Sequence, residues 1–371
     1  MNPETPRKPI LLAVLLAVVG VTLLVLLNNA RQPSPAELPP PKLVRDSAEY
    51  HYTPPAPKDS TRAEAVTNDD TNDVASPKIA REKVEAWLTK HSRNAASLLA
   101  AFRALDDTNY LNEAATNFPN DPRVEMSVLA HNEFPQERRK WLDLLKASSP
   151  SNSLANYLSA EDHFKNGKSD EAVKELVAAS GKSQFQNYAL ETILNGEELF
   201  SESDTPVRLA ASYAMSGMSD ENMPQLASFK IVARGIGDVM KQKTAAGDAA
   251  SAGDLAQLGL DFAGKINSGD SGKLLINQMV GTASASIVLS QLDQNTAYDF
   301  LNGQTPAQAA DTLKQQKVEL RKLMNDFSPA QMQMMMSESE TASYMQRLKI
   351  YGEVEAMKWV IQQHPPADPK K

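Results

Sequence analysis

Residues Ser153–Ala179 read SLANYLSAEDHFKNGKSDEAVKELVAA, and this stretch decides the fold. Two segments of helical length flank Asn166-Gly167-Lys168, a combination typical of a turn. In the second segment small and apolar residues recur at helical spacing, at Ala172, Leu176 and Ala179. The stretch therefore predicts a helix–turn–helix hairpin.

The same helical pattern continues through the chain from Lys78 onward, without the period-two alternation that strands require. Several helix starts are marked by a capping residue directly before a proline. Proline is favoured as the first helical residue because the N–H that it lacks would have no hydrogen-bond partner at that position. These pairs are Ser76-Pro77, Asp121-Pro122, Thr205-Pro206, Thr305-Pro306 and Ser328-Pro329. We therefore predict an all-α body.

Glutamine three residues after the cap completes a capping box in two of these pairs, at Gln308 and Gln331. The first box opens an apolar stripe at Ala309, Leu313, Leu320, Met324 and Phe327. Long helices are expected over Thr305–Phe327 and Glu338–Gln363.

The hairpin at Ser153–Ala179 resembles a tetratricopeptide repeat, a helix–turn–helix unit of 34 residues. The resemblance rests on Ala160, Gly167, Ala172, Leu176 and Ala179. Asn156, Ser159, His163 and Gln184 depart from the family pattern. Turn segments upstream allow up to three units between Ala80 and Phe200, with helices over Pro122–Asn132 and Pro135–Ala147. The resemblance thus implies a repeat domain over residues 78–203, and a generic bundle of helical hairpins is the alternative.

A repeat array of this family presents a concave surface formed by its first helices, which implies a protein or peptide partner. Tyr157, Glu161 and Lys165 have the spacing of one helix face and are the candidate partner-binding residues. An ordinary, partly exposed helix face is the alternative.

Composition changes beyond Asp204, and Ala245–Gly303 are rich in Ala, Gly and Ser. Residues 204–371 are therefore expected to form a second α-helical subdomain or a continuation of the array. Leu274–Leu292 carries no charge, but many polar residues dilute it. A buried helix of a soluble domain is therefore favoured there over a membrane span.

Near the start of the chain, Ile10–Leu27 form an uncharged, aliphatic run long enough to span a bilayer. The run exceeds the apolar region of most cleaved secretory signals, which remain the alternative. Arg7 and Lys8 precede it, so the positive-inside rule places the N-terminus in the cytoplasm and the C-terminal domain outside it. Residues 1–30 are therefore expected to be a cytoplasmic tail and a single-pass anchor.

Between the anchor and the helical body, Arg31–Pro77 contain nine prolines and few large aliphatic residues. Such a composition buries too little apolar surface to offset the entropy of ordering. A disordered, proline-rich linker is expected over residues 31–77.

The chain has 371 residues, no cysteine and a net charge of −8. These values exclude disulfides, thiolate metal sites and cysteine nucleophiles, and they argue against nucleic-acid binding. No nucleotide-binding or zinc-protease motif is complete, so neither a catalytic residue nor a cofactor or metal is predicted. Five histidines occur singly, at His51, His91, His131, His163 and His364.

The function expected from these features is that of a membrane-anchored interaction or scaffold module. One alternative is an extracytoplasmic hydrolase that uses a pair of carboxylates on a helical scaffold. Another is a copper-binding protein that uses the methionine run at Met332, Met334, Met335 and Met336, with Met345 nearby. A plain apolar stripe explains the same methionine spacing.

Overall fold

The structure is a computed structural model that describes residues 79–334 and 337–365, except for the side chains of 217–224, 329, 332 and 333. The chain divides into Met1–Pro77 and a compact unit, Lys78–Lys371. The predicted anchor at Ile10–Leu27 and the linker over residues 31–77 lie outside the described residues. Within the described ranges, no helix combines the length and the apolar character that a membrane crossing requires.

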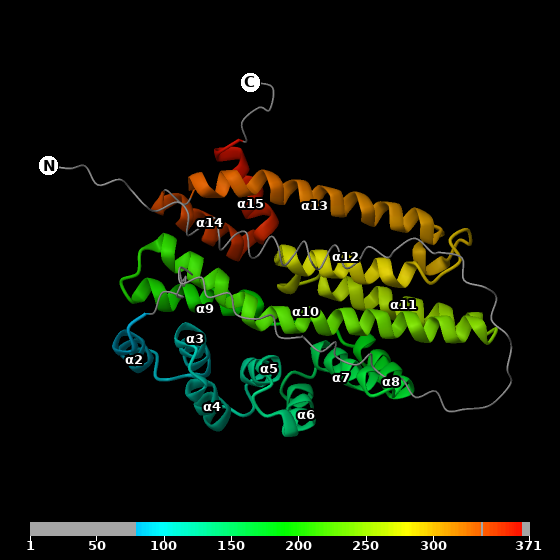
Figure 1. Cartoon of the computed structure of the whole chain (residues 1–371), viewed down its shortest axis with the longest axis horizontal. Coiled ribbons are helices and arrows are strands. Elements are labelled where there is room, and N and C mark those ends of the chain that lie inside the picture. Colours follow the sequence, from blue (N-terminus) through cyan, green and yellow to red (C-terminus); the bar gives the residue numbers. More distant parts are fainter. Residues whose placement is uncertain (1–78, 335–336, 366–371) are drawn as a thin grey trace, which may run out of the picture. The chain divides into compact units, whose positions relative to one another are not determined.

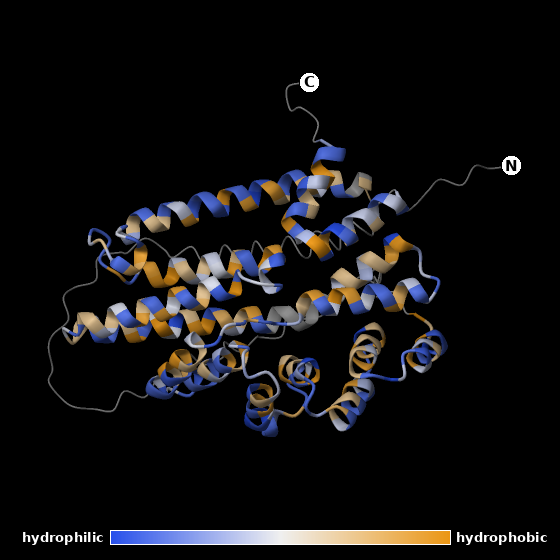
Figure 2. Cartoon of the chain, turned by 180° about the vertical axis from the view of Figure 1, so that it is seen from behind, coloured by the Kyte–Doolittle hydropathy of each residue, from blue (hydrophilic) through white to orange (hydrophobic). Residues whose placement is uncertain are grey.

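Residues 79–334 and 337–365 contain helices and no strand, which confirms the all-α prediction for this part of the chain (Figure 1). The helices, with 3-10 turns marked η, are α2 Arg81–Lys90, α3 Ala95–Leu105, α4 Thr108–Asn117, α5 Pro122–His131, η1 Pro135–Glu137, α6 Arg138–Ser148, α7 Leu154–Lys165, α8 Ser169–Ser180, α9 Ala189–Glu202, α10 Val207–Ala245, α11 Ala249–Ile266, η2 Ser271–Lys273, α12 Leu275–Leu289, η3 Asp299–Leu301, α13 Pro306–Met334, α14 Glu338–Tyr351 and α15 Glu353–Gln363. Figure 2 shows hydrophobic and hydrophilic positions interleaved along them, as amphipathic helices require.

Helices α3–α4, α5–α6 and α7–α8 form three successive hairpins along one side of the compact unit (Figure 1). The α7–α8 hairpin is the one predicted from Ser153–Ala179. Its turn places Gly167 at φ +68°, a conformation that favours glycine. Ala160, Ala172 and Ala179 are fully buried.

Helix α10 joins the hairpins to the rest of the compact unit. At 1.5 Å per residue its 39 residues extend about 58 Å. It packs against α9, α5 and α7 on one side and against α11 and α12 on the other (Figure 1). One continuous apolar cluster runs from Val84 on α2 to Leu292 beyond α12. This cluster therefore includes residues of the predicted repeat region, 78–203, and of the first part of the predicted C-terminal subdomain, 204–371.

Two predicted helix starts are confirmed by their hydrogen bonds, whereas α10 begins at Val207, one residue after Pro206, without a side-chain cap. The Thr305 amide donates to Gln308 Oε1 at 3.0 Å, and the Gln308 amide donates to Thr305 Oγ1 at 3.3 Å, which is a complete capping box. Asp121 accepts from the Arg123 amide at the start of α5. Ser76-Pro77 lies outside the described residues.

Two predicted boundaries in the C-terminal third are wrong. Ser328-Pro329 does not start a helix, because α13 continues through it to Met334. The predicted helix Glu338–Gln363 is divided into α14 and α15 at Gly352, whose φ of +92° is not helical. A Cβ at Gly352 would lie 2.9 Å from the Lys273 carbonyl oxygen, so the break permits a close backbone approach to η2.

The break at Gly352 also places Glu353 against the start of α12. Its carboxylate accepts a hydrogen bond of 2.8 Å from the Leu275 amide, one of the free N–H groups of the first helical turn. Burial nevertheless raises the pKa of Glu353. Helix α12 falls within Leu274–Leu292, and many of its residues are buried, as predicted for a buried helix.

Candidate functional site

The candidate partner-binding face lies on α7, and the structure brings only one of its three residues to the surface. Tyr157 and Glu161 are each 1% exposed, whereas the Lys165 side chain is 53% exposed. A partner would therefore contact Lys165 but would not reach the other two side chains in this conformation.

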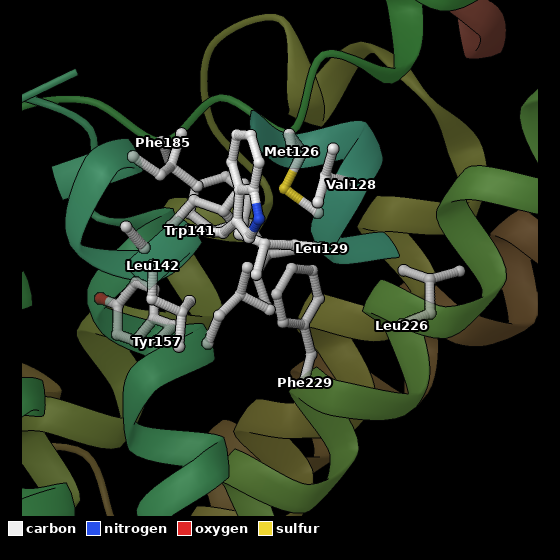
Figure 3. Packing of buried hydrophobic residues seen from close by; sticks show 14 of the residues in the cluster. Met126, Val128, Leu129, Trp141, Leu142, Tyr157, Phe185, Leu226 and Phe229 are labelled. Atoms are coloured by element: carbon white, nitrogen blue, oxygen red, sulfur yellow. The ribbon is translucent and has the colours of Figure 1, made fainter. Parts of the chain in front are cut away.

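Tyr157 is buried because helices from later in the chain cover it. Its ring centroid lies 4.6 Å from that of Phe262 on α11 and 6.1 Å from that of Phe185, in the loop before α9. Phe229 of α10 completes the aromatic cluster, 5.6 Å from Phe185 and 5.8 Å from Phe262. Figure 3 shows Tyr157, Phe185 and Phe229 converging with Trp141 of α6. Helices α10 and α11 thus fill the face on which the sequence predicted a partner.

Burial raises the pKa of the Tyr157 phenol, and the negative charge of Asp261 on α11 raises it further. The phenol is therefore neutral at physiological pH and serves as part of the packing.

Glu161 is buried but paired with two cations. Its carboxylate lies 2.5 Å from Lys165 Nζ and 3.4 Å from Arg138 Nη2 on α6. Arg138 also contacts Asp162, at 3.0 Å from Nε to Oδ1. The two contacts of Arg138 hold α7 against α6, whereas the pair with Lys165 lies within α7.

The departures from the tetratricopeptide pattern at Asn156 and Ser159 have a clear structural basis. Both are buried, and both donate to the Glu175 carboxylate on α8, at 2.7 and 2.9 Å. Lys146 of α6 donates to the same carboxylate at 2.6 Å. Burial opposes ionisation, but these hydrogen bonds prevail and lower the pKa of Glu175. A polar network therefore occupies positions where the family prefers apolar side chains.

Glu125 on α5 has the environment of a candidate general acid. It is 0% exposed, accepts a short hydrogen bond from Ser148 Oγ, and its pKa is raised by burial to about 7. At the N-cap of the same helix, hydrogen bonds from Arg123 outweigh partial burial and lower the pKa of Asp121.

The two carboxyl groups thus have unequal environments, as a carboxylate-based hydrolase would need. Access is the obstacle, because Glu125 is fully buried. A cavity beside α5, lined by Arg103, Arg123, Met126 and Tyr188 among others, has a volume of about 10 Å³, room for roughly one water. This cavity is too small to hold a substrate, so it does not support the alternative function of a carboxylate-based hydrolase.

The methionine run contributes to packing where its side chains are described. Met334 and Met345 are 2% and 5% exposed and lie within the apolar interior. The side chains of Met332, Met335 and Met336 lie outside the described set, so copper binding stays a prediction.

One grouping escaped the sequence patterns because 111 residues separate His91 from Glu202. The fold brings both side chains together with Glu198 between the ends of α2 and α9. Only the tertiary contact between those helices reveals this cluster.

Fold and candidate residues together define an all-α protein in which a row of helical hairpins is covered by helices of its own chain. Comparison with family models, with curated proteins and with solved structures finds no match.

Proposed function

We propose that this chain is a membrane-tethered, tetratricopeptide-like interaction module that binds a protein or peptide partner. The observation that carries the proposal is the row of hairpins α3–α4, α5–α6 and α7–α8, with α10 packed against the second and third hairpins. Helical arrays recognise amphipathic partner segments by packing a helix against their hairpins, as α10 packs here. Because the chain's own α10 and α11 cover Tyr157, a partner binds the outer surface of the array.

The outer surface of the α7–α8 hairpin offers two groups to such a partner. The Lys165 side chain is 53% exposed, and Val177 of α8 is an exposed apolar residue at 55%. Helix α8 also carries a surface ion pair, Glu171 with Lys174 at 3.0 Å. An exposed apolar side chain among charged ones suits a partner with a polar surface that contributes one apolar side chain to the contact.

Tethering rests on the sequence features of the first 77 residues. The aliphatic run Ile10–Leu27 would anchor the chain, and the proline-rich residues 31–77 would let the compact unit reach partners away from the bilayer. The proposed orientation keeps the N-terminus in the cytoplasm and the compact unit outside it. Deleting residues 1–30 should move the protein from the membrane fraction to the soluble fraction.

Photo-crosslinking in native membranes tests the binding surface. A photoreactive amino acid at Val177 should give a discrete adduct with one protein. The same amino acid at Val318 is the matched control, since Val318 is also a valine, is 59% exposed, and lies on α13, outside the hairpin row.

Adducts from Val318 alone would place the partner on another surface and overturn the role of the array. The absence of any discrete adduct from Val177, from Lys165 and from Val318 would overturn the proposal as a whole. Loss of the Val177 adduct on Lys165→Glu would show that the two groups belong to one contact.

A further inference from the structure

His91, Glu198 and Glu202 form a cluster of metal-ligating side chains where α2 meets α9. One ligand atom of each lies within 4.8 Å of the others. His91 is the C-cap residue of α2, and the two glutamates are four residues apart in the last turns of α9. Residues at this spacing project from the same helix face.

We propose that this cluster binds a divalent zinc ion that fastens α2 to α9. One imidazole nitrogen and two carboxylate oxygens are ligands that Zn²⁺ accepts, with water completing a tetrahedral site. The donor set holds no thiolate or thioether, which disfavours Cu⁺. Zinc ligands stand roughly 3.3 Å apart when each bond is about 2.0 Å, so small side-chain rotations would close the site.

The surroundings already orient the ligands for this purpose. The His91 ring lies 4.3 Å from the Trp87 ring, and its Nε2 is 2.9 Å from Glu202 Oε2. Lys90 Nζ, 3.0 Å from the same oxygen, would be displaced by the metal, and its side chain is 66% exposed and free to move.

The position of the cluster gives the ion a definite effect. Besides this cluster, Lys83 joins the same two regions, since its Nζ donates to the Ser203 carbonyl at 2.8 Å. Helix α2 is the first described helix after the predicted linker. A zinc bridge would hold this first helix of the compact unit against α9.

Zinc titration of the full-length chain, purified in detergent and treated with a chelator, tests the inference. Wild-type protein should bind one equivalent of Zn²⁺ at pH 7.5, with a raised melting temperature. Glu198→Gln and His91→Ala should each weaken binding at least about tenfold and abolish the thermal shift. Glu198 is exposed, so its variant should keep the melting temperature of the metal-free wild type.

Two matched controls separate this site from others. Glu197→Gln changes the adjacent carboxylate, which the cluster does not use. His364→Ala breaks a comparable pair, His364 with Glu340 at 3.1 Å, which belongs to no three-ligand group among the described residues. Both variants should bind zinc as the wild type does. The inference would be overturned if the wild type did not bind zinc at 100 μM, which is about a hundred times a dissociation constant of roughly 1 μM. Unchanged affinity in Glu198→Gln would overturn it as well.

Discussion

Phe164 of α7 lies directly against Gly235 of α10, so closely that a Cβ at position 235 would be 2.5 Å from the Phe164 ring carbon Cγ. A real Cβ does not approach another atom so closely. Glycine at this position therefore sets how near α10 approaches the hairpin row. The contact joins the repeat-like region to the helices that cover it.

Replacing Gly235 with alanine should destabilise the compact unit by about 1–3 kcal/mol, because the ring or the helix must shift. Urea unfolding followed by circular dichroism would measure the change. Gly253→Ala is the matched control, since Gly253 lies in α11 with nothing within 4 Å of an added Cβ. That variant should gain about 0.5–1 kcal/mol from helix propensity. Equal effects of the two substitutions would refute the steric argument.

The buried pair of Arg138 and Glu161 supports a second prediction. Glu161 is 1% exposed, so Arg138→Ala should leave its carboxylate with Lys165 alone and cost about 2–4 kcal/mol of unfolding free energy. Lys140→Ala on the same helix removes a side chain that is 63% exposed and should change stability by less than about 0.5 kcal/mol.

A double variant then distinguishes the pair from general damage to α6. Glu161→Gln removes the buried negative charge, so Arg138→Ala should cost less in that background than in the wild type. Costs that add without interaction would show that Arg138 acts through Asp162 or the Leu129 carbonyl instead, which it contacts at 3.0 and 3.1 Å.

Local signals in the sequence predicted local structure well. The Thr305 capping box and the Gly167 turn were both predicted correctly, because each depends on residues within one turn of chain. The interruption at Gly352 was missed because glycine inside a helical pattern is ambiguous until its tertiary neighbour, Lys273, is known. Pro329 was read as a helix start, yet the flanking Phe327 and Ala330 are buried, and their packing outweighs the cost of a proline within α13.

Local spacing could not predict the tertiary neighbours of the candidate site either. Spacing placed Tyr157, Glu161 and Lys165 on one face of α7 but carried no information about which later helix would pack there. Phe229 and Phe262, more than 70 residues further on, decide that Tyr157 is buried. Asn156 and Ser159 read as departures from a family pattern until their shared partner, Glu175, is seen.

The capping box at α13 leads to a third prediction. Thr305→Ala removes the hydroxyl that accepts from the Gln308 amide and should cost about 1 kcal/mol. Hydrogen exchange in the first turn of α13 should become faster, since a helix end without its cap frays. Thr312→Ala serves as control because its hydroxyl bonds only to the Gln308 carbonyl within the helix. The assignment fails if both threonine variants lose equal stability.

Glu125 makes the stability of the fold depend on pH. Its pKa is about 7 in the folded protein and 4.5 as an ordinary glutamate, so the folded state holds an extra proton between these values. Stability contributed by the neutral carboxyl is therefore complete below about pH 4.5 and is lost as the pH rises to 7. The loss approaches about 3 kcal/mol, at 1.4 kcal/mol for each pKa unit.

Glu125→Gln should remove this dependence, because the amide is neutral at every pH and still accepts from Ser148. The variant should match the wild type near pH 4.5 and exceed its stability at pH 8, as measured by urea unfolding across that range. Glu171 supplies a control of opposite sign, since a hydrogen bond from Lys174 lowers its pKa. Glu171→Gln should therefore gain nothing as the pH rises, and a parallel gain in both variants would show that net charge, and not the burial of Glu125, controls the pH dependence.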